Sequence, residues 1–411
     1  MLRVLHSVSN MARAGIETML MNYYREMDTS LIQFDFLANK PDPGEYDEEI
    51  RSRGGRVFVS PGLNPLHYPQ YQRFVADLLG KIPDIRIVHA HNEAMGFYAL
   101  QSAKSAGIRV RIAHAHNTRI IRDYKYPLKL VCKQLLPGAA TDYWGCGTEA
   151  GIYYFGKKRW NESGFILRNA INTAKFAFQP EVRQRLRQAY RLESRFVIGH
   201  VGRFNVQKNH SRLLDIFALI AQAVPEARLV LIGVGELEQA AKEKAWALAL
   251  EDKVLFLGQM AHVNEWYQAM DCFVLPSLFE GLPVVGIEAQ AAGLPCFFSD
   301  RVTDEALLSP NAHRIPLDAS NKDWAKEILT GKQSEARRDR GADLIRRAGY
   351  DIHEEARKLQ NVYLEMAERA RSGKSWDAFG RKQDEPDEQR PFGKDGGKNG
   401  ENGKADRDDR T

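Results

Sequence analysis

Two glutamates with seven residues between them, Glu280 and Glu288, lie where the sequence predicts the start of a helix. The apolar run 272–277 before them is typical of a short strand, and Pro283 has the fixed φ and missing N–H favoured at a first helical position. We therefore expect Glu280 in the loop after the strand and Glu288 about one turn into the helix. Two carboxylates so placed could hold hydroxyl groups at different ends of one extended ligand.

The backbone between the two glutamates could also bind an anion. N–H groups in the first turn of a helix have no partner within it, and Gly281, Leu282 and Pro283 lead into that turn. Gly293 and Pro295 predict where the helix ends. The alternative is that the first glutamate only interacts with the helix dipole and the second is a solvated helix residue.

Two basic residues follow another predicted strand. Arg203 and Lys208 come directly after the apolar run 196–201 and before a helix, and α/β proteins bind ligands beyond the carboxyl ends of such strands. The guanidinium fork and the mobile ammonium could together neutralise a diphosphate. Surface salt bridges are the alternative, but the two glutamates in the same predicted domain favour the diphosphate.

Further candidates lie in the N-terminal half. Gly15 follows the first predicted strand, where a glycine lets backbone N–H groups approach a phosphate or sugar, although a plain helix-start turn is the alternative. His114 and His116 end another strand and share a face with each other. With His89 and His91 they could form a metal site, but no carboxylate or cysteine at ligand spacing joins them, so we predict no metal. A single cleft histidine that donates a hydrogen bond to a sugar hydroxyl or leaving oxygen is the better interpretation.

Apolar runs alternate with longer helical patterns along the chain, which predicts an α/β fold. The apolarity is continuous rather than alternating, which favours mostly parallel strands covered on both faces. Two Rossmann-like units are expected, with strands at 2–6, 34–37, 56–60, 85–90 and 110–115 and then at 196–202, 227–233, 254–257, 271–275 and 296–299.

The domains are predicted at residues 1–180 and 190–345, separated by a charged, Pro-containing connection. Residues 346–372 are expected to form a terminal helix that returns to the N-terminal domain. Residues 373–411 contain almost no apolar residue, cannot bury enough surface to order themselves, and are predicted to be disordered.

Composition narrows the class of protein. A chain of 411 residues with 44% hydrophobic residues can form two sizeable cores. The four cysteines form no Cys-x-x-Cys pair, which argues against a disulfide framework or structural zinc and favours a reducing cytosol. The first apolar run is too short for a signal peptide, and no stretch approaches the ~18 apolar residues of a spanning helix. A soluble or peripheral cytoplasmic protein is therefore expected.

One basic segment stands out between residues 104 and 133, with aromatic and aliphatic residues interleaved in its second half. Such a segment can lie on an anionic membrane surface, or it can be a core helix with a solvated basic face. No recognised nucleic-acid motif accompanies the charge, so nucleic acid is not expected as a partner. The basic residues are Lys104, Arg109, Arg111, Arg119, Arg122, Lys125, Lys129 and Lys133, against the single acid Asp123.

Together these elements resemble the retaining glycosyltransferases of the GT-B fold, specifically family 4, over nearly the whole chain except the tail. The family's Glu-x7-Glu motif is matched by Glu280 and Glu288, and its basic pair by Arg203 and Lys208. The resemblance implies that Glu280 approaches the hydroxyls of the donor sugar and Glu288 the ribose. It also implies that the two basic residues bind the diphosphate.

The N-terminal glycine loop of the family is matched by Gly15, and its cleft histidine most closely by His116. The resemblance implies that Gly15 contacts the same phosphates from across the cleft and that His116 faces the sugar. Two departures from the family pattern are Ala14, in place of the usual first glycine of the loop, and Ala170, in place of the glycine in an interdomain Asn-Gly.

The resemblance implies transfer of a hexose from a nucleotide sugar to a growing glycan, with a lipid-linked oligosaccharide or another glycan as the acceptor. It also implies that the reaction needs no cofactor and no metal. The subgroup it resembles most makes bacterial exopolysaccharide or capsule. Two alternatives remain at this point: a GT-B-type nucleotide-sugar epimerase, and a non-catalytic nucleotide-sugar-binding partner.

Overall fold

The computed structural model describes residues 1–63, 65–120, 122–331 and 338–372. The described residues belong to one large compact unit. The tail that the sequence predicts to be disordered, 373–411, lies outside the described residues, so its disorder stays a prediction.

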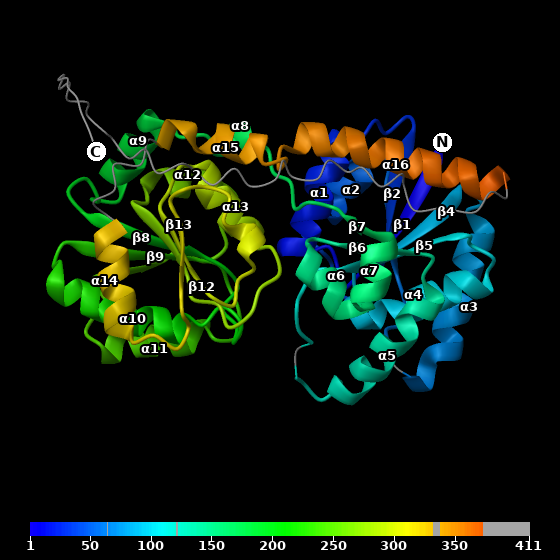
Figure 1. Cartoon of the computed structure of the whole chain (residues 1–411), viewed down its shortest axis with the longest axis horizontal. Coiled ribbons are helices and arrows are strands. Elements are labelled where there is room, and N and C mark those ends of the chain that lie inside the picture. The colour runs from blue at the N-terminus through cyan, green and yellow to red at the C-terminus, as the bar shows by residue number, and fades with distance from the viewer. Residues whose placement is uncertain (64, 121, 332–337, 373–411) are drawn as a thin grey trace, which may run out of the picture. The chain divides into compact units, whose positions relative to one another are not determined.

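The first sheet of the large unit has seven parallel strands in the order β3-β2-β1-β4-β5-β6-β7 (Figure 1). Every residue of the two inner strands β1 and β2 is buried, which explains why the apolar pattern is continuous instead of alternating. Five of the strands were predicted, and the short β6 and β7 were not. The strands are β1 (Leu2–Val8), β2 (Ile32–Ala38), β3 (Arg56–Val59), β4 (Ile85–Ala90), β5 (Val110–Ala115), β6 (Asp142–Gly145) and β7 (Gly164–Ile166).

The second sheet has six parallel strands in the order β10-β9-β8-β11-β12-β13. The α/β prediction of two successive Rossmann-like units is therefore confirmed, and only β13 was missed. The strands are β8 (Phe196–Val201), β9 (Ala227–Ile232), β10 (Val254–Phe256), β11 (Cys272–Leu275), β12 (Cys296–Ser299) and β13 (Ala312–Ile315).

Helices connect the strands and cover the sheets, as parallel pairing requires. Around the first sheet these are α1 (Gly15–Glu26), α2 (Asp47–Ser52), α3 (Tyr68–Lys81), α4 (Gly96–Ser105), α5 (Tyr126–Ala139), α6 (Thr148–Phe155) and α7 (Lys157–Ser163). The later helices are α8 (Thr173–Phe176), α9 (Pro180–Ala189), α10 (His210–Ala223), α11 (Glu238–Ala247), α12 (Val263–Ala269), α13 (Val284–Ala291), α14 (Asn321–Gly331), α15 (Gly341–Arg347) and α16 (Ile352–Ser372). Short 3-10 turns are η1 (Pro65–His67), η2 (Glu93–Met95), η3 (Asp304–Ala306) and η4 (Arg338–Arg340).

Each sheet reverses its strand order at one point, between β1 and β4 in the first and between β8 and β11 in the second. Loops at the carboxyl ends of strands diverge at such a switch point and leave a crevice for a ligand. The predicted site residues lie at the ends of β1, β5, β8 and β11 or in the loops and helix starts that follow them, so the topology places each of them at a switch point or one strand away.

The terminal helix α16 runs beside α1 (Figure 1). The side-chain oxygen of Gln360 accepts a hydrogen bond from the backbone N–H of Asp28 at 2.9 Å, and the hydroxyl of Tyr363 is 2.7 Å from Nδ1 of His89. The chain enters this helix through a parallel bridge between Ile171 and Asp351. α16 therefore completes the core of the first sheet.

Apolar side chains fill the space between the sheets and their helices. Each of the four cysteines is buried. Within the described residues, no helix combines the length and the apolar character that crossing a membrane requires.

Candidate functional site

Glu280 lies in the loop between β11 and α13, as the sequence predicts, and its side chain is buried. Its Oε1 is 2.6 Å from Nζ of Lys208, and Nε2 of Gln207 donates to its Oε2 at 3.1 Å. The side chains of Glu280 and Lys208 are only 7% and 15% exposed. The structure therefore joins one predicted acid and one predicted base in a shielded ion pair, where electrostatic attraction exceeds that at the surface.

The second predicted base lies apart from this pair. The side chain of Arg203 is 67% exposed, and its Nη2 is 3.5 Å from Oε2 of Glu236. Lys208 is held more firmly. Its backbone N–H donates to Oδ1 of Asn205, and its aliphatic carbons pass so close to Gly202 that a Cβ built on this glycine would be 3.2 Å from them. An exposed ion pair contributes little free energy, so Arg203 can turn toward a ligand at small cost.

Helix α13 begins one residue later than predicted. Pro283 is its N-cap, with φ −73° and ψ 116°, and Val284 is the first helical residue. An extended conformation is usual at an N-cap, and proline adopts it readily. The helix ends at Ala291, and Gly293 has φ +70°, which confirms the predicted glycine stop.

Gly281 lies against the carboxyl end of β5. A Cβ built on this glycine would be 2.2 Å from the backbone oxygen of His116 and 3.2 Å from Sγ of Cys146. Cβ atoms do not approach a carbonyl oxygen that closely, so this position accepts only glycine while the loop keeps its place. The predicted acid loop and the predicted histidine are thus in backbone contact.

Two hydrogen bonds hold the same loop, and neither donor is among the residues predicted from the sequence. Nδ2 of Asn169 donates to the carbonyl of Leu282 at 2.7 Å, and the hydroxyl of Thr118 donates to the carbonyl of Glu280 at 3.2 Å. Both donors follow strands of the first sheet within three residues, which is the one signal in the sequence that could have marked them.

Glu288 lies in the middle of α13, just over one turn from its first residue, and is partly buried. Burial raises the pKa of its carboxyl group to about 7, and the hydroxyl of Tyr267 and the charge of Lys175 act in the opposite direction. The Tyr267 hydroxyl is 2.9 Å from Oε2 of Glu288. This carboxyl group therefore changes between an acceptor-only carboxylate and a neutral acid near neutral pH.

His116 and His114 lie side by side, with ring centroids 4.1 Å apart. His116 keeps 8% of its surface exposed and His114 only 1%. Burial lowers the pKa of His116 to about 3 and lowers that of His114 as well, so both rings are neutral. A contact between His114 and a substrate stays a prediction, because the ring is enclosed by protein in this structure.

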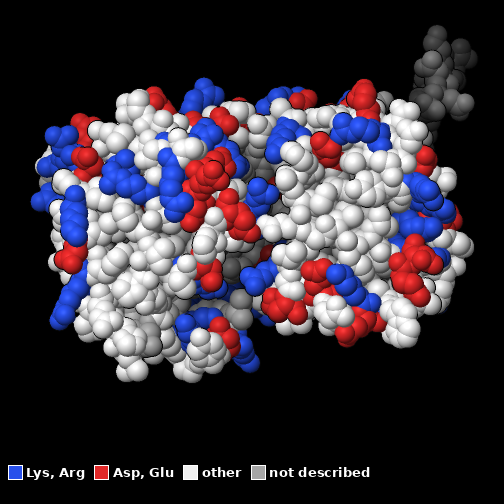
Figure 2. All heavy atoms as spheres, turned by 180° about the vertical axis from the view of Figure 1, so that it is seen from behind, with Lys and Arg blue, Asp and Glu red and all other residues white. Residues whose placement is uncertain are grey.

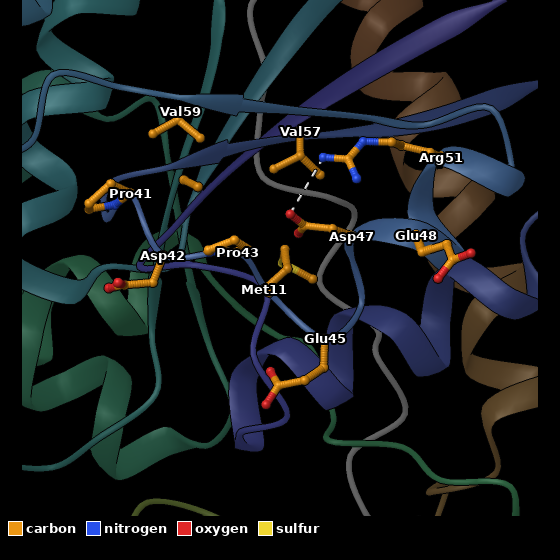
Figure 3. Close-up of a pocket in the computed structure, with 12 residues that line it drawn as sticks. Met11, Pro41, Asp42, Pro43, Glu45, Asp47, Glu48, Arg51, Val57 and Val59 are labelled. Carbon is orange, nitrogen blue, oxygen red and sulfur yellow. Dashed lines mark ion pairs between the residues drawn. The ribbon is translucent and has the colours of Figure 1, made fainter.

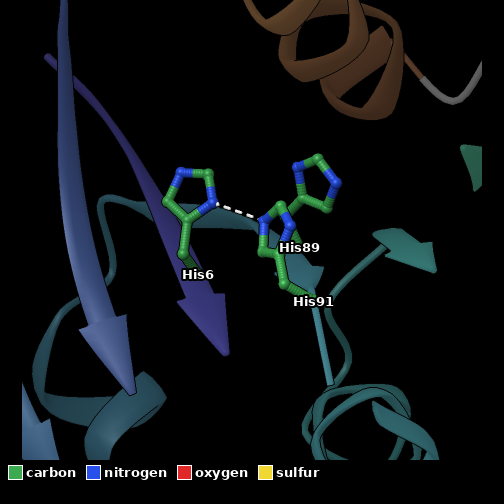
Figure 4. A group of neighbouring side chains, drawn as sticks. All are labelled: His6, His89 and His91. Carbon is green, nitrogen blue, oxygen red and sulfur yellow. Dashed lines mark hydrogen bonds between the residues drawn. The ribbon is translucent and has the colours of Figure 1, made fainter. Parts of the chain in front are cut away.

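His6, His89 and His91 extend this pair into a buried cluster of five imidazoles on β1, β4, β5 and the loop ends that follow them (Figure 4). Ring nitrogens lie within 4.8 Å of one another in two groups, one formed by His6, His89 and His91 and the other by His91, His114 and His116. Both groups consist of neutral histidines alone, which can ligate a metal ion chemically. The prediction that the site uses no metal is unaffected by this geometry and stays a prediction.

Gly15 is the first residue of α1 and is exposed. A Cβ built there would meet no atom within 4 Å, so packing within the protein does not explain the glycine. The preceding Ala14 is an extended N-cap without a side-chain hydrogen bond. The unfilled helix start is compatible with the predicted approach of a phosphate.

A cavity of about 540 Å³ lies near the carboxyl ends of β2 and β3 (Figure 3). It shares no lining residue with the Glu280 cluster. Its charged side chains are mostly acidic, and an ion pair joins Arg51 to Asp47 at 3.5 Å. Carboxylates in such a cavity can accept hydrogen bonds from hydroxyl groups. The lining residues are Met11, Ala38, Pro41, Asp42, Pro43, Gly44, Glu45, Asp47, Glu48, Arg51, Val57 and Val59.

Comparison with known families matches both halves of the chain. Residues 182–340 match the family described as Glycosyl transferases group 1, and residues 13–142 match Glycosyltransferase Family 4. The Glu280 cluster lies in the first of these ranges and the histidine cluster, apart from His6, in the second.

Individual proteins match different shares of the chain. EpsF of Bacillus subtilis (strain 168), which carries a glycosyltransferase name, is 37% identical over 369 residues, covering 88% of this chain and 96% of EpsF. The UDP-Gal:alpha-D-GlcNAc-diphosphoundecaprenol alpha-1,3-galactosyltransferase of Escherichia coli is 28% identical over 228 residues, covering 52% of this chain and 57% of that enzyme.

Solved structures share the fold. Anabaena Alr3699/HepE in complex with UDP-glucose has a TM-score of 0.73 and 18% identity, covering 89% of this chain and 100% of that one. This likeness establishes the two-domain GT-B architecture.

Proposed function

The chain belongs to the glycosyltransferases, in the families described as group 1 and family 4, and we propose that it moves a hexose from a nucleotide-sugar donor onto a growing glycan. The observation that carries this proposal is the shielded Glu280–Lys208 pair beyond the switch point of the second sheet. A carboxylate and an ammonium held together there suit a ligand that carries sugar hydroxyls beside a diphosphate.

In the proposed reaction, the bond from the anomeric carbon to the diphosphate oxygen breaks and the acceptor hydroxyl oxygen bonds to that carbon. The acceptor oxygen bonds on the same face that the diphosphate leaves, which retains the configuration, and the acceptor proton passes to the leaving phosphate oxygen. Negative charge grows on the nucleoside diphosphate, and Lys208, Arg203 and the N-terminal N–H groups of α13 are suited to stabilise it. We propose that these groups take the place of a divalent metal and that the reaction uses no cofactor.

The experiment that tests this function is a panel of nucleotide sugars, UDP-glucose among them, screened by thermal shift and by release of the nucleoside diphosphate, with and without EDTA. Stabilisation by one donor with slow, EDTA-insensitive release supports a metal-independent transferase and identifies its donor. Conversion of the donor into an isomer without release would instead indicate an epimerase. Tight binding with neither release nor transfer to added glycan acceptors would indicate a binding protein.

Donor affinity is expected to fall about tenfold between pH 8 and pH 6 if Glu288 binds the ribose as a carboxylate. With a pKa of about 7, its ionised fraction falls from about nine-tenths to about one-tenth over this range, and apparent affinity follows that fraction. The diphosphate of a nucleotide sugar has no ionisation in this range. Calorimetric titration at both pH values measures the change.

The Tyr267→Phe variant provides the control for this pH dependence. The Tyr267 hydroxyl lowers the pKa of Glu288, so its removal should move the midpoint of the affinity curve to higher pH. A donor affinity that is the same at pH 6 and pH 8 in the wild type would contradict the assignment of Glu288.

We further propose that the reaction takes place in the cytoplasm, on the inner face of the cell membrane, with a lipid-linked acceptor in exopolysaccharide or capsule synthesis. The name of the E. coli relative specifies a diphosphoundecaprenol acceptor, which supports this class. The basic segment 104–133 supports the location, because its helix α5 carries exposed apolar side chains among its lysines: Val131 is 56% exposed, and Tyr124 just before the helix is 88% exposed. On the face shown in Figure 2, basic and acidic side chains are interspersed, which is unlike a nucleic-acid surface.

Binding to vesicles that contain anionic lipid should weaken about tenfold or more when Lys125 and Lys129 are both replaced with Gln. Each basic residue near such a surface contributes about 1 kcal/mol. The matched control is Lys157→Gln with Lys158→Gln, which removes two exposed lysines from α7. Vesicle co-sedimentation measures the effect, and equal losses in both double variants would argue against α5 as the docking surface.

A further inference from the structure

The buried histidines form hydrogen-bonded chains, and one of these chains ends at His116. Nδ1 of His6 is 3.0 Å from Nε2 of His91, and Nδ1 of His91 is 3.0 Å from Nε2 of His116 (Figure 4 shows the first contact). His6 and His91 are 0% and 2% exposed, so His116 is the link with the most exposed surface. A chain of ring-to-ring hydrogen bonds therefore runs from the core of the first sheet to the end of β5.

Burial lowers the pKa of every member, to about 3 for His6 and for His116, so each ring is neutral. A neutral imidazole has one N–H and one lone pair, and each ring-to-ring hydrogen bond needs one of each. The three rings must therefore adopt tautomers in step. Either all three carry the proton on Nδ1, or all three carry it on Nε2.

The environment of His6, the first ring in this series of hydrogen bonds, distinguishes the two arrangements. Nε2 of His6 is buried and has no hydrogen-bond partner. In the second arrangement this atom would be a buried N–H without an acceptor, which proteins avoid more strictly than an unused acceptor. The first arrangement leaves only a lone pair unused there, and it gives His116 an N–H on Nδ1.

We propose that His6 and His91 are positioning residues that hold His116 as the Nδ1–H tautomer, so that His116 presents a hydrogen-bond donor to the transferred sugar or the leaving oxygen. This inference rests on the proposed function for its catalytic consequence. The tautomer itself follows from the hydrogen-bond chain and can be measured without any turnover.

A metal ion within the cluster explains the geometry less well. Both ring nitrogens of His91 are engaged by other imidazoles, and both nitrogens of His89 are engaged by Tyr363 and His114. The rings of His89 and His91 lie 4.1 Å apart at 31°, so their in-plane lone pairs do not converge on one point. Protons shared between rings account for the short nitrogen-to-nitrogen distances.

The second series of hydrogen bonds, from Tyr363 through His89 to His114, supplies a matched control. His89 lies two residues from His91 at the end of the same strand, is equally buried, and joins Tyr363 to His114 without a hydrogen bond to His116. His91→Phe and His89→Phe therefore remove the same ring from the same core. Only the first removes the partner of Nε2 on His116.

The experiment is long-range ¹⁵N–¹H spectroscopy of the full chain with ¹⁵N-labelled histidine rings, in which the His116 signals are assigned by their loss in His116→Gln. The wild type and His89→Phe should show His116 protonated on Nδ1, and His91→Phe should shift it toward Nε2–H. An Nε2–H tautomer in the wild type would overturn the proposal, whatever the transfer assay gives. Stoichiometric binding of Zn²⁺ that His6→Phe abolishes would overturn it too.

Kinetics provide the second readout. Once a donor is identified, His91→Phe should lower kcat about 10²-fold with little change in KM for the donor, the size of loss typical of a preorganised hydrogen-bond donor. His89→Phe should lose much less. Equal losses in the two variants, in step with their thermal stability, would reduce His91 to a packing role and overturn the proposal.

Discussion

The Glu280→Gln variant should lose about 10²- to 10³-fold in transfer rate while remaining folded. An amide has nearly the shape of a carboxylate, but its single oxygen can accept from only one of Gln207 and Lys208, which donate to different oxygens of Glu280. It also lacks the charge that holds the lysine and binds hydroxyls strongly. Losses of this size are typical when one preorganised polar group of an active site is removed. Steady-state kinetics beside thermal unfolding measure the two effects separately.

Glu236→Gln is the matched control, because Glu236 is exposed and is 3.5 Å from Arg203 in a surface ion pair. Its transfer rate should change little. Lys208→Ala tests the partner differently: it leaves the buried carboxylate uncompensated, and breaking a buried pair in this way costs about 3 kcal/mol of stability. Near-normal turnover in Glu280→Gln would contradict the role proposed for this loop.

Much of the fold was predictable because parallel strands buried on both faces leave continuous apolar runs in the sequence. β1 and β2, each wholly buried, are the clearest cases. The strands missed were β6, β7 and β13, which have at most four residues and lie at or near the sheet edges. Their runs are too short for a period to be recognised.

The site was predictable where its residues follow a strand directly. Glu280 and Lys208 come from loops after the neighbouring strands β11 and β8, so their contact follows from the topology once both strands are recognised. Arg203 follows β8 just as closely, yet its long side chain points to Glu236. The spacing of residues in the sequence predicts the position of the backbone, but it does not predict the rotamer of an exposed arginine.

The histidine chain could not have been predicted from spacing. Its three members come from the three adjacent strands β1, β4 and β5, and their contact depends on strand order and register: His6 is paired with His89 across β1 and β4. The pairs at 89 and 91 and at 114 and 116 were visible in the sequence, but His6 carried no signal. Nothing local indicates that β1 lies beside β4 and not at the edge of the sheet.

Gly281→Ala should be the most disruptive single-methyl change at the site. The added Cβ would lie 2.2 Å from the backbone oxygen of His116, which cannot swing away as a flexible side chain could. The loop must then move, and we expect a loss of about 1–3 kcal/mol of stability with a loss of about 10²-fold in transfer, because displacement by 1 Å commonly costs that much. Chemical denaturation and transfer kinetics measure both effects.

Gly80→Ala is the same substitution in open space and serves as the control. A Cβ at Gly80, inside α3, meets nothing within 4 Å, and alanine is favoured over glycine in a helix by roughly 0.5–1 kcal/mol. This variant should be as stable as the wild type or slightly more so, with unchanged transfer. If Gly281→Ala behaved in the same way, the backbone contact between the acid loop and the end of β5 would be wrong, and with it the argument that His116 and Glu280 act on one ligand.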